Sequence, residues 1–232
     1  MPLTPPDCFN CHCKDCSILK NCNKEWLSLI NERKNYFVCK KGQAIIYEGM
    51  MMDSLYFIYQ GKAKSVAAGL FGKQQIQGLA KTGDILGFRG MGGTYTFPSS
   101  VYAIEDSCIC AIDRELFLDV LKANPDLTLE MLMLVTDELR KSELRMKNLS
   151  LMNVREKIAN SLLYIYEVFG NASSGELDVL LSRQEIAEIA GTTKEQVSKC
   201  LSEFEQEGKI KTDRKKIIIP STKELRRVTG EF

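Results

Sequence analysis

The stretch LLSRQEIAEIAGTTKEQVSKCLSEFEQEGKIKTDRKKIIIP, residues 180–220, decides how the C-terminal part of the chain folds. Ser182 and Glu185 have the spacing of a capping box, which predicts the start of a helix. Gly191 can adopt the left-handed conformation that ends a helix. Thr192 with Glu195, or Thr193 with Gln196, can cap the helix that follows. Apolar residues in the second helix recur at steps of four and three, as on one buried face. Two short helices joined by a tight glycine turn predict a helix-turn-helix.

The residues after this unit predict a basic β-hairpin, which would form a wing. Residues 208–227 include eight Lys or Arg and two Asp or Glu, whereas the formal net charge of the whole chain is only +1. A basic surface beside a helix-turn-helix suits the phosphate backbone of DNA. The alternative is a helical hairpin that only packs, followed by a solvated basic tail. We expect double-stranded DNA to be contacted by Thr193, Glu195, Gln196, Ser198, Lys199, Lys211, Arg214, Lys215 and Lys216.

Residues 26–123 have the sequence pattern of a β domain. From Val38 to about Ile112, short apolar runs alternate with glycine-containing turns. Short strands with regular turn punctuation predict an antiparallel barrel or sandwich.

Residues 124–153 predict a long helix with a coiled-coil seam. Positions spaced alternately by three and four residues are mostly apolar over about three heptads, although Ser142 interrupts them. The seam predicts self-association; the alternative is a single helix packed on its own domain. A small C-terminal domain would then occupy residues 154–232. The predicted dimer contacts are Leu132, Val135, Leu139, Met146 and Leu149.

Residues 1–25 form a segment rich in cysteine and proline. Five of the nine cysteines lie within CFNCHCKDCSILKNC, residues 8–22, beside the only histidine, His12. These thiols could form disulfides, hold structural zinc, hold an iron–sulfur cluster or remain unliganded. An odd cysteine count and a reducing compartment argue for a metal over a disulfide framework. Cys11 and Cys13 are separated by one residue, too tight for two independent arms on one zinc ion.

Composition narrows the class of protein. Apolar residues make up 44% of the chain and charged residues 26%, as in a globular protein. The sequence has neither an apolar run of membrane-spanning length nor a secretory signal, which predicts a cytoplasmic location without membrane contact. With one histidine there is no Ser–His–Asp set outside the cysteine cluster, and neither a P-loop nor a dinucleotide-binding motif is present, so we do not expect an enzyme.

In the order of its parts the chain resembles the CRP/FNR family of bacterial transcription regulators. SLYFIYQGKAKSV and KTGDILGF are similar to strands and a turn of the family's β-roll. The resemblance implies an α+β fold: an N-terminal antiparallel β-roll of the cyclic-nucleotide-binding jelly-roll type, a long dimerisation helix and a C-terminal winged helix-turn-helix. It also implies a homodimer bound to an inverted-repeat operator, with RNA polymerase as a further partner.

The N-terminal cysteines are similar to those of the FNR branch. That branch places C-x2-C-x5-C before the β-roll and a fourth cysteine late in it, and together they hold an oxygen-labile [4Fe–4S] cluster. The resemblance implies that Cys13, Cys16, Cys22 and Cys110 are the ligands here, with Cys110 in the stretch AIEDSCICAIDRELF. Cys108 would face the same side of the strand and is a substitute. Cys8 and Cys11, which the pattern does not require, are bystanders or alternative ligands.

Two other comparisons with the family separate this chain from its branches. The cyclic-nucleotide branch has G-E-x-G followed by an Arg-Ser pair, whereas GDILGFRGMGGTYTFPSSVYA has neither and its Arg89 is misplaced. We therefore expect no cyclic nucleotide. The FNR recognition helix carries E-x-x-S-R, and this chain has Glu195, Ser198 and Lys199 instead, which puts the half-site in doubt because lysine lacks the bidentate fork of arginine.

These features predict a homodimeric DNA-binding transcription regulator that senses oxygen or redox state through a cysteine-held iron–sulfur cluster. The alternative keeps the DNA binding and replaces the sensor with another small ligand, haem, zinc or thiol oxidation.

Overall fold

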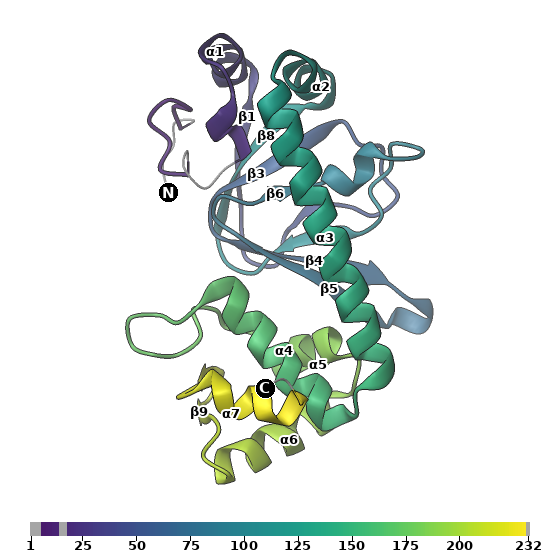
Figure 1. Cartoon of the computed structure of the whole chain (residues 1–232), viewed down its shortest axis with the longest axis vertical. Helices are drawn as coiled ribbons and strands as arrows, with labels where there is room; N and C mark the ends of the chain where they lie inside the picture. Colours follow the sequence, from purple (N-terminus) through teal and green to yellow (C-terminus); the bar gives the residue numbers. More distant parts are fainter. Residues whose placement is uncertain (1–5, 14–17, 231–232) are drawn as a thin grey trace. The chain divides into compact units, whose positions relative to one another are not determined.

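A computed structural model describes residues 6–13 and 18–230. The chain divides into two compact units, residues 1–67 with 78–140 and residues 68–77 with 141–232. The first unit is a β domain flanked by helices, and the second is mainly helical (Figure 1).

The β domain consists of two four-stranded sheets. One has the strand order β1–β8–β3–β6 and the other β2–β7–β4–β5, with antiparallel pairing of β8 to both β1 and β3 and of β7 to both β2 and β4. The strands are β1 (Asn35–Cys39), β2 (Ala44–Ile46), β3 (Ser54–Gln60), β4 (Lys62–Ala68), β5 (Gln74–Lys81), β6 (Ile85–Leu86), β7 (Ser100–Ala103) and β8 (Ser107–Asp113). The predicted antiparallel β-roll is therefore confirmed.

Strand β8 runs through the centre of this domain. Six of its seven residues are buried, because β1 and β3 cover its two edges and the core covers its faces. Ile109 and Ile112 of β8 are fully buried together with Leu55 and Phe117. The turn before β4 requires Gly61, which has φ 120° and lies so close to Ser107 that a Cβ would be 2.1 Å from its Oγ. The core thus fixes the strand that carries Cys108 and Cys110.

Helices enclose the ends of the β domain. Asn23 caps the first long helix by accepting from the Trp26 backbone N–H, and Asp113 caps the second. Pro125 opens the longest helix, where its missing N–H costs nothing. These helices and the short 3-10 turns are η1 (Ile18–Asn21), α1 (Lys24–Arg33), η2 (Leu70–Gly72), η3 (Phe88–Met91), α2 (Arg114–Ala123) and α3 (Pro125–Leu151).

The second unit contains the predicted helix-turn-helix and wing. The backbone N–H of Ser182 donates to Glu185 at 2.7 Å and that of Glu185 donates back to the Ser182 hydroxyl at 3.2 Å, which completes the capping box. Gly191 is left-handed at φ 61°, as the sequence predicts, and of the two candidate caps Thr193 is the one that caps the next helix. The elements are α4 (Val154–Phe169), α5 (Arg183–Ala190), α6 (Lys194–Gln206), β9 (Lys211–Asp213), β10 (Lys216–Ile218) and α7 (Thr222–Thr229).

Helix α7, which follows the basic hairpin, was not predicted from the sequence. Its buried Leu225 is part of an apolar face only one residue wide per turn, and the other positions are mostly charged. Helix α7 is stabilised by packing on α4, a partner that lies more than fifty residues away in sequence. No helix in the described part of the chain is both long and apolar enough to cross a membrane.

Candidate nucleic-acid interface and thiol site

Helix α6 presents the predicted DNA-reading residues to solvent. Glu195, Ser198 and Lys199 are exposed, whereas Val197 and Leu201 are buried against the rest of the unit. This division follows the helical period, which turns positions 197 and 201 inward and leaves 195, 198 and 199 outward. The exposed face can therefore meet base edges in a major groove.

Local hydrogen bonds order the start of α6. Thr193 accepts from the backbone N–H of Gln196 at 3.3 Å, and the Thr192 hydroxyl donates to the Gln196 amide oxygen. Hydrogen bonds from its own backbone N–H and from Thr193 lower the pKa of the Glu195 carboxyl, so this group is ionised at neutral pH. An ionised carboxylate accepts hydrogen bonds only, which suits the amino group of cytosine.

Ion pairs hold the other end of α6 in place. Arg155 of α4 donates to Glu203 at 2.8 Å and to Glu207 at 2.6 Å, and its guanidinium lies 4.6 Å from the centre of the Phe204 ring. On the wing side, Glu205 accepts from the backbone N–H and the hydroxyl of Thr212. The recognition helix is thus joined both to α4 and to the wing.

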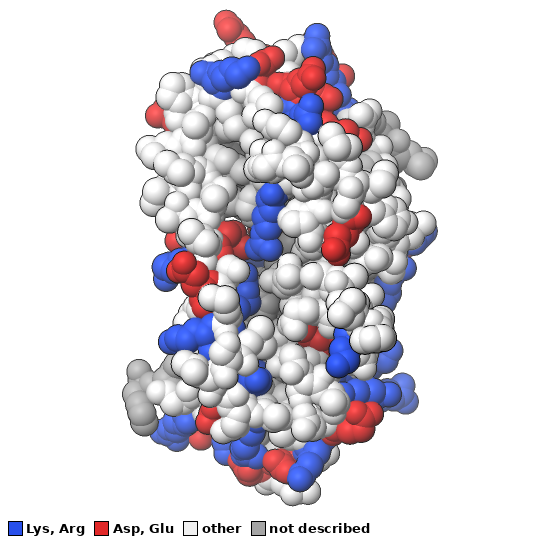
Figure 2. Space-filling view, turned by 90° about the vertical axis from the view of Figure 1, so that its right-hand side faces the viewer, with Lys and Arg blue, Asp and Glu red and all other residues white. Residues whose placement is uncertain are grey.

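The wing carries less unpaired positive charge than the sequence count indicates. Lys216 forms an ion pair with Glu176 at 2.9 Å, and this hydrogen bond lowers the pKa of Glu176 to about 2. Lys209 pairs with Glu207, while Arg226 and Arg227 of α7 pair with Glu167 and Glu224. In the view of Figure 2, positive and negative side chains alternate over the second unit.

Three of the predicted wing cations remain available to phosphate. Lys211, Arg214 and Lys215 are exposed and form no ion pair within the described residues. Arg214 and Lys215 make the two-residue turn between β9 and β10, where Arg214 adopts φ 55°. The tip of a hairpin projects from its domain, so these charges can reach a DNA backbone.

Helix α3 exposes the predicted dimer seam. The side chains of Leu132, Leu139 and Met146 are 60%, 59% and 65% exposed, an unusual condition for large apolar residues on one helix. Leu149 differs, because it is half-buried and its Cδ2 lies 3.2 Å from where a Cβ of Gly191 would be. Further exposed apolar residues that the heptad count did not include are Leu129, Met133, Leu144 and Leu151.

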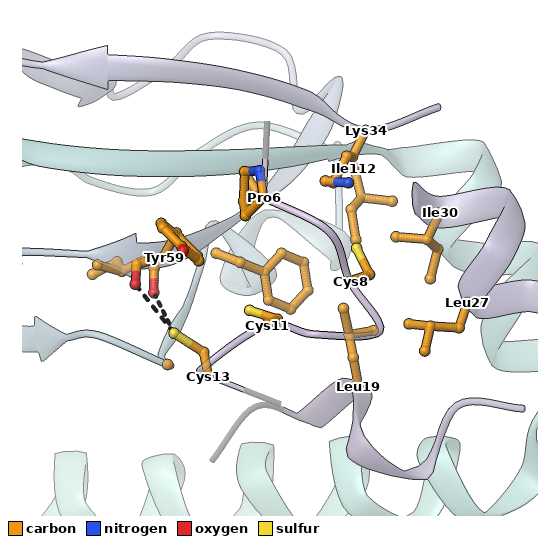
Figure 3. Close-up of a pocket in the computed structure, with 14 residues that line it drawn as sticks. Pro6, Cys8, Cys11, Cys13, Leu19, Leu27, Ile30, Lys34, Tyr59 and Ile112 are labelled. Atoms are coloured by element: carbon orange, nitrogen blue, oxygen red, sulfur yellow. Dashed lines mark hydrogen bonds between the residues drawn. The ribbon is translucent and has the colours of Figure 1, made fainter. Parts of the chain in front are cut away.

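The structure brings several cysteines together at one pocket of the β domain (Figure 3). The N-terminal segment contributes Cys8, Cys11 and Cys13, and β8 contributes Cys110, about a hundred residues away in sequence. Other lining residues are apolar, apart from Lys34 and Tyr59. A pocket lined by soft sulfur donors has the chemistry of a thiophilic metal or cluster site.

Two further predicted thiols, Cys22 and Cys108, are not among the described residues that line this pocket. Cys22 is half-buried; burial first, and then the nearby Cys8, raise its pKa to about 11. Cys108 is fully buried beside Tyr36, whose pKa is raised by burial and by a hydrogen bond with this thiol. Cys16 lies outside the described residues. Among the residues that are described, no group of three or more His, Cys, Asp or Glu side chains is arranged to hold a single metal ion.

Hydrogen bonds anchor the cysteine segment to the β domain. The backbone N–H of Cys8 donates to the Asn31 side chain of α1 at 2.9 Å. The Cys13 thiol donates to the Tyr59 carbonyl of β3 at 3.1 Å and is only 4% exposed. His12 rests its ring against that of Tyr59, with the two centres 4.4 Å apart. The single histidine of the sequence therefore packs on an aromatic ring.

The thiols of this pocket differ in their acidity. Burial raises the pKa of Cys110 to about 12. A hydrogen bond from Cys13 lowers the pKa of Cys11 to about 6, against the effect of its own burial. Cys8 and Cys11 lie outside the C-x2-C-x5-C pattern, and their nearness to Cys13 is the sequence signal for their place in the pocket.

The loop that corresponds to a cyclic-nucleotide cassette is occupied by an internal contact. Arg89 in η3 forms an ion pair with Glu138 of α3 at 3.0 Å. This guanidinium is therefore matched by a carboxylate of the same chain.

Comparison with known proteins matches both parts of the chain. The family profile described as "Cyclic nucleotide-binding domain" matches residues 37–124, and "Crp-like helix-turn-helix domain" matches residues 156–228. The fumarate nitrate reduction regulatory protein of Klebsiella oxytoca is 30% identical over 230 residues, or 95% of this chain and 91% of that protein. The fumarate and nitrate reduction regulatory protein of Escherichia coli K12 is 30% identical over 94% of this chain and 90% of its own length.

Solved structures show the same fold at lower identity. FixK2 from Bradyrhizobium japonicum has a TM-score of 0.76 with 21% identity, covering 84% of this chain and 96% of its own. A CooA mutant from Carboxydothermus hydrogenoformans has a TM-score of 0.73 with 18% identity, covering 98% of both chains. With 30% identity over nearly its full length to the two regulatory proteins, the chain belongs to the CRP/FNR family of DNA-binding transcription regulators.

Proposed function

We propose that this regulator is a homodimer that senses oxygen or redox state through a [4Fe–4S] cluster held by Cys13, Cys16, Cys22 and Cys110. The observation that carries the proposal is the pocket at which Cys110 of β8 meets the N-terminal cysteines. This arrangement would let one ligand join the N-terminal segment to β8.

The donor set fits such a group in chemistry. Thiolates are soft ligands that hold iron–sulfur clusters, and a cubane has corners spread widely enough to accept donors that no single ion could gather. A cluster with four thiolates is anionic, and the ammonium of Lys34, a lining residue, offsets negative charge there. A bound cluster would supply the oxygen-labile chemistry, while the chain supplies donors, an apolar wall and the strand β8.

Exposed apolar residues support the dimeric part of the proposal. In Figure 2 uncharged side chains cover most of the visible face of the first unit, and the α3 residues Leu132, Leu139 and Met146 are exposed apolar side chains. A second copy of the same helix would bury them in a two-fold seam. Such a dimer presents two α6 helices to an inverted repeat, and RNA polymerase would be the further partner on a promoter.

Anaerobic purification with iron, sulfide and zinc analysis tests the sensor. We expect iron and acid-labile sulfide in the full-length protein, with a visible absorption that air bleaches. Cys110→Ala should remove both, because it deletes the one donor from β8. Cys200→Ala, a buried cysteine of α6, is the matched control and should keep the parent's iron.

Colourless anaerobic protein with stoichiometric zinc would contradict the cluster and favour the zinc alternative. Metal-free protein that binds operator DNA equally with and without air would contradict oxygen sensing altogether.

A further inference from the structure

The thiol pocket is lined by two cysteines that the family pattern does not require. Cys8 and Cys11 line it together with Cys13 and Cys110, although only the last two belong to the C-x2-C-x5-C pattern with its fourth cysteine. Figure 3 shows Cys11 between Cys8 and Cys13, on the same stretch of backbone. The described chain thus offers a choice of donors at one place.

Cys11 and Cys13 are separated by a single residue, which limits how they can act together. Two side chains so close along the backbone cannot spread as independent arms around one metal ion. Each is nevertheless at the pocket wall, and Cys13 is held there by its hydrogen bond to the Tyr59 carbonyl. Both thiols therefore lie at the same part of the pocket, where either could supply a donor.

The segment that carries Cys11 is built to stay at the pocket. Asp7 accepts from the backbone N–H of Phe9 at 3.1 Å and from the Asn10 amide at 2.6 Å, which forms a tight turn before Cys11. The Cys8 backbone is tied to Asn31 of α1. The turn shapes the segment locally, and the bond to Asn31 attaches it to the β domain beside the pocket.

We infer that Cys11 is a reserve ligand of this site, able to take the place of Cys13. The inference rests on the proposed cluster, and it gives the ligand set a redundancy that the C-x2-C-x5-C pattern does not contain. Loss of either thiol leaves one donor for the ligand position of Cys13, whereas loss of both leaves none.

The test compares Cys11→Ser, Cys13→Ser and the double variant in the full-length protein, purified without air. The readouts are iron and sulfide per chain, and the extent of iodoacetamide labelling at each cysteine by mass spectrometry. We expect both single variants to keep most of the iron and the double variant to lose it. In Cys13→Ser, Cys11 should become protected from labelling, because a liganded thiolate is a poor nucleophile.

Cys8→Ser combined with Cys13→Ser is the matched control, which removes a neighbouring thiol and leaves Cys11 in place. It should behave as Cys13→Ser alone. If Cys13→Ser already loses all the iron while the parent retains it, Cys11 is not a reserve ligand, although the cluster stands. If Cys11 in iron-loaded Cys13→Ser is labelled as fast as in metal-free protein, the inference also fails. Absence of iron from the parent overturns the cluster and this inference together.

Discussion

Single residues of the predicted DNA-binding surface are expected to have two different roles, base recognition and phosphate contact. Glu195 and Lys199 lie on the outward face of α6, and the wing tip carries Arg214 and Lys215. A carboxylate can accept from cytosine, whereas a wing cation meets a phosphate that is the same at every base pair. Lysine at position 199 offers one point contact where arginine would offer a fork, so discrimination at its base should be weaker.

Glu195→Ala should therefore relax the preference at one base pair by about 1–3 kcal/mol, while Lys215→Ala should weaken all sequences alike and lower the salt slope by about one. Lys216→Ala is the matched control; it should change the slope less, because Glu176 already neutralises this ammonium. Binding to a randomised half-site library at several salt concentrations measures both effects. An unchanged sequence preference in Glu195→Ala, with an altered one in Lys215→Ala, would reverse the two roles.

Among the elements, α6 depends on contacts at both of its ends. Capping residues order the start, and these follow from the sequence because they interact within four residues. The far end is held by Arg155 of α4, about fifty residues earlier in the chain. Such a contact was not predictable, because it needs the tertiary packing of α4 against α6. The same holds for α7, which packs on α4.

Arg155→Met should destabilise the second unit by about 1–2 kcal/mol, since it removes a partly exposed double ion pair and a cation–π contact over Phe204. We expect operator affinity to fall as well, because the end of α6 near the wing is no longer fixed. Arg140→Met is the control, as Arg140 makes only an exposed pair with Asp137. Chemical unfolding of both variants measures the difference; equal stability would show that the pair contributes little to holding α6.

At the scale of the whole molecule, the exposed apolar residues of α3 could be buried against a second copy of the chain. The described chain leaves Leu139 and Met146 in water, and burying them would be favourable by the hydrophobic effect. Half-buried Leu149, which the heptad count also included, packs toward Gly191 of its own chain. Part of the Leu149 side chain is thus already covered within its own chain, and the remaining exposed surface is what a second copy could bury.

Leu139→Glu and Met146→Glu should each shift the protein toward monomer, because a two-fold interface would bring two like charges together in an apolar setting. Leu70→Glu in η2 is a control, since Leu70 is a still more exposed leucine, at 81%, outside α3. Light scattering over a range of concentrations gives the mass. Unchanged dimers in both α3 variants would place the interface elsewhere.

The sequence by itself determined the helix-turn-helix, the β-roll class and the position of the long helix, because caps, turns and apolar periods act within a few residues. Ser182 forms the predicted capping box and Gly191 adopts the predicted left-handed conformation, while Thr193 is one of the two caps that the sequence allowed. Only the tertiary structure decided which thiols line one pocket and which cations are neutralised. Cys11 and Cys110 meet there, and Glu176 reaches Lys216, because the fold brings together segments whose separation along the chain carries no local signal.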